Sequence, residues 1–217
     1  MTTKSIPLTE DLHAYLVAHG SPPDQIMREL IEETRAALPD DAQMQVAPEQ
    51  AAFLTFLTRL LGARRAVEVG TFTGLSSLAI ARGLVDGGRL TCFDISEEYT
   101  GIARRYWTRA GVDDRIDLRI GPAGETLREL PYEREIDVAF IDADKTGYPI
   151  YWSELVPRMR PGGVIAVDNV LRGGRVIAPG NADDRAIAAF NDEVLADVRV
   201  DAVMLPIADG LTLARVH

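Results

Sequence analysis

Residues 66–76, AVEVGTFTGLS, read as a short apolar strand, a glycine turn and the start of a helix. Gly70 and Gly74 permit a tight turn and let a small ligand approach the backbone closely, and the free N–H groups of the following helix can bind polar groups. A plain connecting turn would carry the same glycines. The turn lacks the dinucleotide-binding pattern G-x-G-x-x-G, because Phe72 occupies the position of the middle glycine. A nucleotide-dependent oxidoreductase is therefore disfavoured.

Short β-branched runs alternate with helix-length segments from residue 65 onward, which is typical of a parallel sheet covered by helices on both faces. The last two runs are joined by five residues, too few for a helix, and should form an antiparallel hairpin. We therefore predict an α/β fold with a Rossmann-like, doubly wound, mostly parallel sheet of seven strands. The expected strands are 66–69, 89–93, 115–120, 136–141, 163–167, 198–205 and 211–216, with crossover helices near 74–84, 97–110, 122–130 and 147–158.

Residues 1–62 are expected to form an N-terminal helical extension ahead of a ligand-binding domain, residues 63–217. The segment Ser21-Pro22-Pro23-Asp24 has the pattern of a helix start, with a serine cap and a proline at the first helical position. Apolar residues follow at helical spacing up to Leu38, and again between residues 48 and 61, with a polar connector between the two stretches. We interpret this extension as a lid or as a dimer surface.

The chain of 217 residues is long enough for one well-packed domain, and 23 Lys and Arg against 33 Asp and Glu give a net charge of −10. This sign makes nucleic acid an unfavourable partner. The single cysteine, Cys92, excludes an internal disulfide and a multi-cysteine metal site, and its apolar surroundings predict a buried, inert thiol. The first eleven residues lack an apolar signal core, and no apolar run is long enough to cross a membrane. A cytoplasmic protein is expected.

Residues directly after the strands are candidates for the ligand site, because ligands of doubly wound sheets bind beyond the carboxyl ends of the strands. Asp94 ends the second strand and can accept two hydrogen bonds from a ribose diol; the alternative is a helix cap, for which Ser96 is better suited. The turn at residues 121–124 offers little side-chain bulk and suits an adenine ring, although it also resembles a proline-initiated helix start.

The strongest chemical signal follows the fourth and fifth strands. The segment FIDADK, residues 140–145, puts two acids and a lysine beyond an apolar strand, and Asp168 and Asn169 follow the next strand. Asp142, Asp168 and Asn169 are therefore expected to converge at one edge of the sheet. Two carboxylates and an amide oxygen suit a hard divalent cation such as Mg²⁺. Helix capping is the alternative, but it would not require so many acids.

Together, residues 68–76, 140–145 and 168–169 resemble the cation-dependent class I O-methyltransferases, the family of caffeoyl-CoA and catechol O-methyltransferases. Residues 44–50 and 168–174 are similar to its bacterial members, and the resemblance extends from about His13 to the C-terminus. It implies S-adenosylmethionine (SAM) as methyl donor and a divalent cation: Mg²⁺, Mn²⁺ or Ca²⁺. The donor contacts implied by the resemblance are Val46, Glu68, Gly70, Thr71, Ser76, Asp94, Ala123 and Asp144.

The resemblance further implies that Asp142, Asp168 and Asn169 hold the cation and that Lys145 and Asp142 act in catalysis. Lys145 matches the lysine that serves as catalytic base in the catechol enzymes; stabilisation of an oxyanion is the alternative role. Plant members have an asparagine that helps to bind the acceptor where this chain has Gly173. This departure argues against a coenzyme A ester as substrate.

The expected function is methylation of one hydroxyl of a vicinal dihydroxy aromatic, a small-molecule acceptor, by a homodimer. A tRNA hydroxyuridine O-methyltransferase of the same family would share these motifs, with a basic patch formed by Arg158, Arg172 and Arg175. The acidic net charge disfavours it, and a non-catalytic binding protein is disfavoured by the presence of the cation residues and the lysine. The glycine-containing loop 172–180 is expected to cover the acceptor, and both tryptophans are expected to be packing residues.

Overall fold

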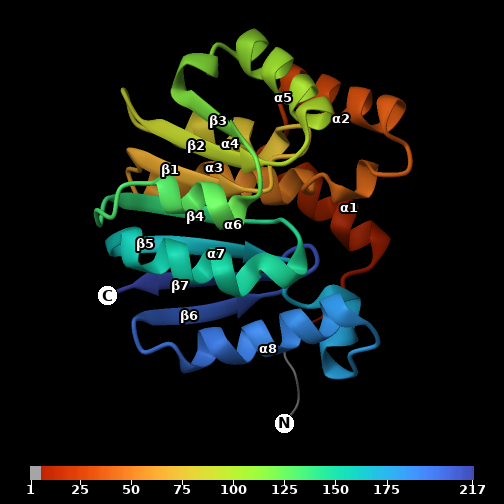
Figure 1. Ribbon diagram of the computed structural model, residues 1–217. Coiled ribbons are helices and arrows are strands. Elements are labelled where there is room, and N and C mark those ends of the chain that lie inside the picture. The colour runs from red at the N-terminus through yellow and green to blue at the C-terminus, as the bar shows by residue number, and fades with distance from the viewer. Residues whose placement is uncertain (1–5) are drawn as a thin grey trace.

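The computed structural model describes residues 6–217 and has three layers, with a central sheet between two layers of helices (Figure 1). Residues 1–5, which belong to the stretch considered for a signal, lie outside the described part. The seven strands are arranged in the order β3-β2-β1-β4-β5-β7-β6, which confirms the predicted fold class. Their bounds are β1 Arg65–Val69, β2 Arg89–Asp94, β3 Ile116–Ile120, β4 Ile136–Ile141, β5 Met159–Asp168, β6 Val200–Leu205 and β7 Leu211–Val216.

The sheet is parallel from β3 to β5, and β7 pairs antiparallel with both β5 and β6. The predicted C-terminal hairpin is therefore confirmed. Because β1 lies between β2 and β4, the chain leaves β1 in one direction across the sheet and later returns past it in the other. This change of direction opens a crevice beyond the carboxyl ends of β1 and β4, where doubly wound sheets bind their ligands.

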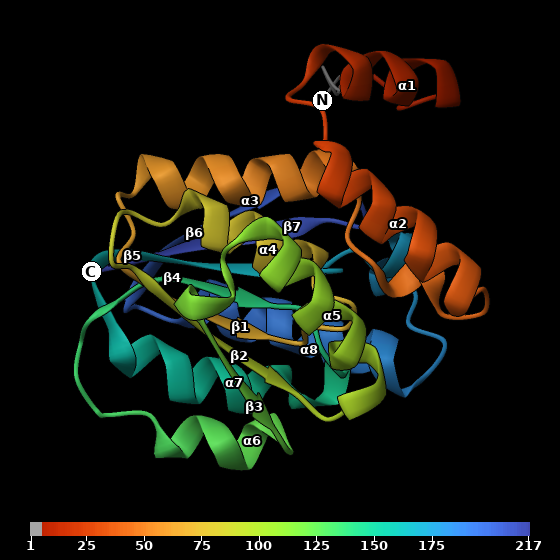
Figure 2. The ribbon, with the colours of Figure 1, turned by 90° about the horizontal axis from the view of Figure 1, so that it is seen from above.

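Helices cover both faces of the sheet, as Figure 2 shows from above. One face packs against α2 (Gln25–Ala37), α3 (Pro48–Leu60), α4 (Leu75–Gly83) and α5 (Glu97–Ala110). The other packs against α6 (Ala123–Thr126), α7 (Tyr148–Leu155) and α8 (Ala182–Ala196). Helix α8 is not among the predicted helices, although Asn181 caps it and Ile187, Phe190 and Val194 recur at helical spacing on its buried side.

Short 3₁₀ turns complete the chain. They span Ala42–Met44, Asp113–Arg115, Leu127–Glu129, Lys145–Gly147, Val156–Arg158 and Arg172–Ile177. The expected helices near 122–130 and 147–158 are therefore each divided into a short α-helix and a 3₁₀ turn. Among residues 6–217, no helix combines the length and the apolar character that a bilayer crossing requires.

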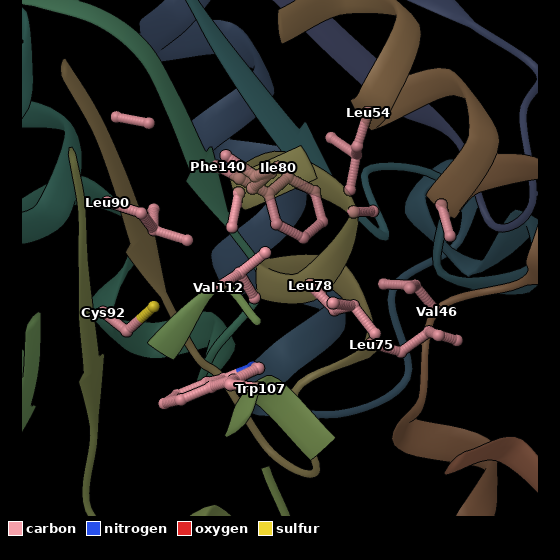
Figure 3. Packing of buried hydrophobic residues seen from close by; sticks show 14 of the residues in the cluster. Val46, Leu54, Leu75, Leu78, Ile80, Leu90, Cys92, Trp107, Val112 and Phe140 are labelled. Carbon is pink, nitrogen blue, oxygen red and sulfur yellow. The ribbon is translucent and has the colours of Figure 1, made fainter. Parts of the chain in front are cut away.

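The larger core fills the space between the sheet and helices α2 to α5. In Figure 3, Phe140 of β4 lies against Ile80 of α4, with Leu54 of α3 and Leu90 of β2 nearby. Cys92 is fully buried in this core, and burial raises the pKa of its thiol well above the ordinary value. The prediction that this thiol is buried is confirmed, and the two tryptophans are buried as expected.

The N-terminal helices differ in how they attach to the sheet. Helices α2 and α3 contribute Met27, Leu30 and Leu54 to the larger core. By contrast, α1 (Glu10–His19) buries none of its residues, and its His13 imidazole meets the Glu49 carboxylate of α3 at 2.8 Å. The expected boundary near residue 62 falls between α3 and β1, although the core continues across it.

The predicted start of α2 at Ser21 is wrong. The helix begins at Gln25, and the Asp24 carboxylate caps it by accepting a hydrogen bond of 2.9 Å from the Met27 N–H. A residue that precedes proline is driven out of the helical region, so Pro23 prevents Pro22 from opening the helix. The next short polar side chain, Asp24, then becomes the cap.

A buried carboxylate clamps the amino end of the sheet. Asp137 of β4 accepts hydrogen bonds from the N–H groups of Arg64 (2.7 Å) and Arg65 (2.8 Å) and pairs with the Arg160 guanidinium of β5. Burial would raise the pKa of Asp137, but Arg160 and the two backbone donors hold it below the ordinary value. This carboxylate therefore joins three neighbouring strands at the end opposite the crevice.

We expect Asp137→Ala to lower the free energy of unfolding at pH 7 by about 2–4 kcal/mol, because three donors lose their acceptor. The pKa of Asp137 is lower in the folded state than in the unfolded state. The carboxylate therefore stabilises the fold fully at a pH above its unfolded-state pKa, and this stabilisation is lost as the pH falls through its folded-state pKa. The difference from the wild type should therefore narrow below pH 3.8. Urea unfolding measures this free energy. The control is Asp201→Ala at an exposed position, which should stay within about 0.5 kcal/mol of the wild type. Equal free energies of unfolding for the two variants would contradict a stabilising role of Asp137.

Candidate active site

A cavity of about 840 Å³ opens beyond the carboxyl ends of β1, β2, β4 and β5. This volume is near the upper end for ligand sites, roughly 300–1,000 Å³, and leaves room for two ligands side by side. The glycine turn after β1 forms one side, and the segments after β4 and β5 form the other. Residues 43–47 and Gln50 from the N-terminal helical region also line it.

The glycine turn approaches the end of β4 so closely that only glycine fits. Gly70 has φ +90°, and an added Cβ would lie 2.0 Å from the carbonyl oxygen of Asp142. Phe72 also adopts a left-handed conformation, with φ 51°. Asp94 holds the turn in this shape, because its Oδ2 accepts hydrogen bonds from the N–H groups of Thr71 (2.9 Å) and Phe72 (2.8 Å).

Asp94 has a further structural contact, since its Oδ1 accepts a hydrogen bond of 2.8 Å from the Ser96 N–H. Ser96, and not Asp94, caps α5, as its side chain accepts from the Tyr99 N–H. Each oxygen of a carboxylate can accept more than one hydrogen bond, so Asp94 keeps acceptor capacity toward the cavity.

Seven of the eight residues predicted to bind the donor line this one cavity. They are Val46, Gly70, Thr71, Ser76, Asp94, Ala123 and Asp144. Asp144 is oriented by hydrogen bonds from the Tyr151 hydroxyl and from the Thr146 hydroxyl, the latter at 3.2 Å. The predicted turn at residues 121–124 both lines the cavity, through Gly121 and Ala123, and starts α6.

Glu68 is the exception and does not line the cavity. Alternation along β1 turns its side chain to the α4 side of the sheet, where it is fully buried. Cys92, its partner across the β1–β2 register, donates a hydrogen bond of 3.4 Å to Oε2, while Oε1 has no hydrogen-bond partner among the described residues. Burial raises the pKa of Glu68 to about 8. The carboxyl group therefore lies beneath the turn and faces the hydroxyls of Thr71 and Ser76 from below.

The residues predicted for catalysis and cation binding meet at the ends of β4 and β5. The Lys145 ammonium donates hydrogen bonds to Asp142 Oδ1 (3.1 Å), Asn169 Oδ1 (2.6 Å) and the Tyr148 hydroxyl (2.7 Å). The Tyr148 hydroxyl in turn donates to the backbone carbonyl of Asp168 at 3.1 Å. The predicted convergence of these side chains is therefore present, with Lys145 at its centre.

Asp168 is almost fully buried at this point. Burial, together with the negative charge of Asp142, raises its pKa to about 7. One of its oxygens accepts a hydrogen bond of 2.7 Å from the N–H of Asn169, which adopts φ 57°, a conformation that asparagine tolerates better than most residues. Two carboxylates thus face each other with a single ammonium group to compensate them.

This donor set fits a hard divalent cation. Asp142 and Asp168 supply carboxylate oxygens, Asn169 supplies an amide oxygen, and the mutual repulsion of the two acids calls for positive charge. Gln50 of α3 also faces this carboxylate: its buried Nε2 opposes the rise in the pKa of Asp168 but forms no hydrogen bond of ordinary length within the described chain. Residues 6–217 contain no cluster of three or more His, Cys, Asp or Glu side chains arranged around a metal position. The third ligand would therefore have to be the asparagine.

The far end of the cavity lies beyond β5 and β7, away from the glycine turn. It is lined by Arg172, Asp183, Ala208 and Asp209. The Arg172 guanidinium pairs with Asp183 (3.5 Å) and with the fully buried Asp184 (3.3 Å). Motion of the loop 172–180 stays a prediction, but its first residue does reach the cavity.

The basic patch considered for a nucleic acid does not form. Arg158 precedes β5 and is therefore at the opposite end of the sheet, where it is buried and paired with Glu154 at 2.9 Å. Arg172 and Arg175 share Asp184, with the Arg175 pair at 3.1 Å. Their charges are therefore compensated within the chain.

Two contributors to the site were missed by the sequence analysis. Tyr148 follows Lys145 by three residues, a spacing that places it on the first turn of α7 directly under the ammonium group. Gln50 lies in the segment 44–50, which resembles bacterial members of the family, but the resemblance implies no role for this residue. Periodicity indicates that α3 is amphipathic, but it does not reveal that the start of this helix reaches the edge of the sheet.

The fold and the cavity define a SAM-dependent methyltransferase of the doubly wound class, and the similarity to known proteins agrees. Residues 18–217 match the O-methyltransferase family, so the chain belongs to that family. The chain is 44% identical over 205 residues to probable caffeoyl-CoA O-methyltransferase 1 of Dictyostelium discoideum, with 92% of the chain and 89% of the relative covered.

Solved structures of similar proteins contain the donor or its demethylated product. The O-methyltransferase of Bacillus cereus in complex with SAH superimposes with a TM-score of 0.86 at 35% identity, covering 95% of this chain and 97% of that one. TomG of Streptomyces achromogenes in complex with SAM has a TM-score of 0.86 at 30% identity, with coverages of 95% and 96%. The resemblance inferred from the motifs is therefore confirmed at the level of the family and of the donor.

The buried Glu68 predicts a pH effect on stability. Its folded-state pKa is raised from 4.5 to about 8, so the folded chain binds more protons than the unfolded chain between these values and loses stability as the pH rises. Glu68→Gln removes this titration. Relative to the variant, we expect the wild type to lose up to about 1 kcal/mol per pH unit between pH 5.5 and 7.5. Urea unfolding at three pH values measures this difference, and parallel stability curves would contradict it.

Proposed function

We propose that this O-methyltransferase transfers the methyl group of SAM to one hydroxyl of a vicinal dihydroxy aromatic compound and requires a divalent cation. The observation that carries the proposal is the meeting of Asp142, Asp168 and Asn169 around Lys145, next to the donor turn. When bound, the cation would supply the positive charge that favours the phenolate form of a catechol, whose hydroxyl is otherwise a poor nucleophile at neutral pH. The expected compartment is the cytoplasm.

The contribution of the chain is mainly orientation. The turn at Gly70 and the carboxylate of Asp94 would hold the donor on the β1 side, and the acceptor would lie on the β5 side, so that one of its oxygens faces the sulfonium methyl group. The bond between sulfur and methyl carbon breaks, a bond between oxygen and methyl carbon forms, SAH is released and the hydroxyl proton passes to water. Asp144 and Val46, which line the donor side, would complete the donor site.

Lys145 would act next to the reacting oxygen. Its ammonium donates to three oxygens at once, so in this arrangement all its N–H groups are in use. These contacts favour the charged role, in which the Lys145 ammonium would exchange one of these partners for the phenolate oxygen of the bound acceptor. Tyr148 holds the ammonium in place from below, through a hydroxyl that is itself fixed by the Asp168 carbonyl.

Removal of the divalent cation should abolish the activity. After treatment with EDTA and gel filtration, we expect transfer of labelled methyl from SAM to catechol to stop, and added Mg²⁺ to restore it. In the same assay, Asp168→Ala should lower turnover roughly 100-fold, because a cation contributes several kcal/mol of charge stabilisation. Full activity after thorough metal removal would contradict the cation requirement.

The Asp168→Ala variant also separates catalysis from folding. Binding of SAH, measured by calorimetry, should stay within about threefold of the wild type, because no hydrogen bond among the described residues joins Asp168 to the glycine turn. Exposed Asp201→Ala is the matched control and should change neither quantity. Equal loss of turnover and donor binding in Asp168→Ala would assign this residue a folding role instead.

We further propose that two copies of the chain associate through the N-terminal helices. Tyr15 of α1 and Phe56 of α3 are both 63% exposed, and Leu12, Leu16 and Leu60 are exposed beside them in the same two helices. A helix of ten residues with none buried is marginal on its own and needs a partner surface. A second copy offers the same apolar surface in self-complementary form about a two-fold axis.

Light scattering tests this association. We expect a mass near twice 23.7 kDa at micromolar concentration, and Tyr15→Asp/Phe56→Asp should shift it toward the single-chain value. Leu195→Asp places the same charge at another exposed apolar residue, at the end of α8, and is the control. A single-chain mass for the wild type would refute the proposal.

A further inference from the structure

The cavity is lined by more acidic than basic side chains, and this imbalance affects which acceptor can bind. Within the described part of the chain, six lining residues are acids and two are cations, so 2 − 6 gives −4. SAM carries a net positive charge, and a divalent cation would offset much of the remainder near Asp142 and Asp168. Neither of these ligands would compensate the acids at the far end of the cavity.

The two lining cations are already engaged. Lys145 donates to Asp142, Asn169 and Tyr148, as described above. Arg172 pairs with Asp183 and with Asp184, which is fully buried. An anionic group that enters the cavity would therefore find no free cationic side chain to bind.

The far end of the cavity, where the acceptor would lie, carries excess negative charge. Arg172, Asp183 and Asp209 line it, which gives a local sum of 1 − 2 = −1. Asp209 is fixed across the opening, because its Oδ1 accepts a hydrogen bond from the Gly173 N–H and its backbone carbonyl accepts one of 3.0 Å from the Leu171 N–H. Arg185 lies on the same helix as Asp183 but does not line the cavity.

We infer that the acceptor is a catechol whose side chain is neutral or positively charged, and that Asp183 and Asp209 select against a carboxylate or a coenzyme A thioester. This inference rests on the proposed function and deepens it. An anionic side chain would lose hydration beside two carboxylates without gaining a counter-charge. An ammonium group would instead exchange water for carboxylate contacts, and complementary charge of this kind contributes chiefly to specificity and to the rate of association.

Three catechols that differ only in the end of a saturated side chain provide the test. We would compare 2-(3,4-dihydroxyphenyl)ethylamine, the corresponding ethyl alcohol and 3,4-dihydroxyphenylacetate at pH 7 with Mg²⁺ and SAM, together with a coenzyme A thioester of 3,4-dihydroxycinnamate. We expect kcat/KM to be about 10-fold higher for the amine than for the carboxylate at low ionic strength. This ratio should fall toward about 2 in 0.5 M salt, because salt screens exposed charges. The thioester should be the poorest substrate.

Asp183→Asn/Asp209→Asn removes both acids and keeps an oxygen that can accept the Gly173 N–H. In this variant the amine-to-carboxylate ratio of kcat/KM should fall at least about threefold. Asp192→Asn/Asp201→Asn makes the same change in net charge at exposed positions outside the cavity, and it should keep the wild-type ratio.

The outcomes separate the two proposals. Failure of the enzyme to methylate any of the catechols, with SAH binding intact, would overturn the proposed function and this inference with it. Methylation of the carboxylate or the thioester at least as efficiently as the amine would leave the proposed function standing and overturn the inference. An equal fall of the ratio in the control variant would also overturn it, because the effect would then come from net charge and not from the two lining acids.

Discussion

The contact between the Gly70 backbone and the Asp142 carbonyl is the constraint on which the site depends. Because no side chain separates the glycine turn from the end of β4, the side of the cavity formed by this turn lies next to the side formed by Asp142 and Lys145. Asp94 braces the turn from the β2 side, and the Lys145 network braces the end of β4 from the β5 side. Methyl transfer requires two reactants in line and in contact, which is what this adjacency provides.

The fold and most of the site could be predicted from the sequence because their signals are local. A β-branched run followed by glycines, or by acids, marks a strand end, and all parallel strands end at the same edge of the sheet. Asp142, Lys145, Asp168 and Asn169 were therefore placed together without knowledge of the strand order. The hairpin followed from the length of one connection.

Side-chain positions that depend on contacts between distant elements could not be predicted from local sequence patterns. Glu68 reads as a strand-end acid, but the alternation of β1 turns it beneath the turn and into the core. The arginines 158, 172 and 175 read as a possible patch, but one lies at the other end of the sheet and two share a buried carboxylate. Gln50 and Tyr148 act through contacts with residues from other elements, which periodicity does not report.

Crystals soaked with Mn²⁺ and SAH test whether a divalent cation binds beside the donor, because the anomalous signal of manganese locates the cation independently of any assay. We expect an anomalous peak bonded to oxygens of Asp142, Asp168 and Asn169, beside the sulfur of SAH. An absence of any peak at saturating Mn²⁺, with the Lys145 ammonium still joining Asp142 to Asn169, would contradict this expectation. Such a result would show that the lysine alone compensates the two acids.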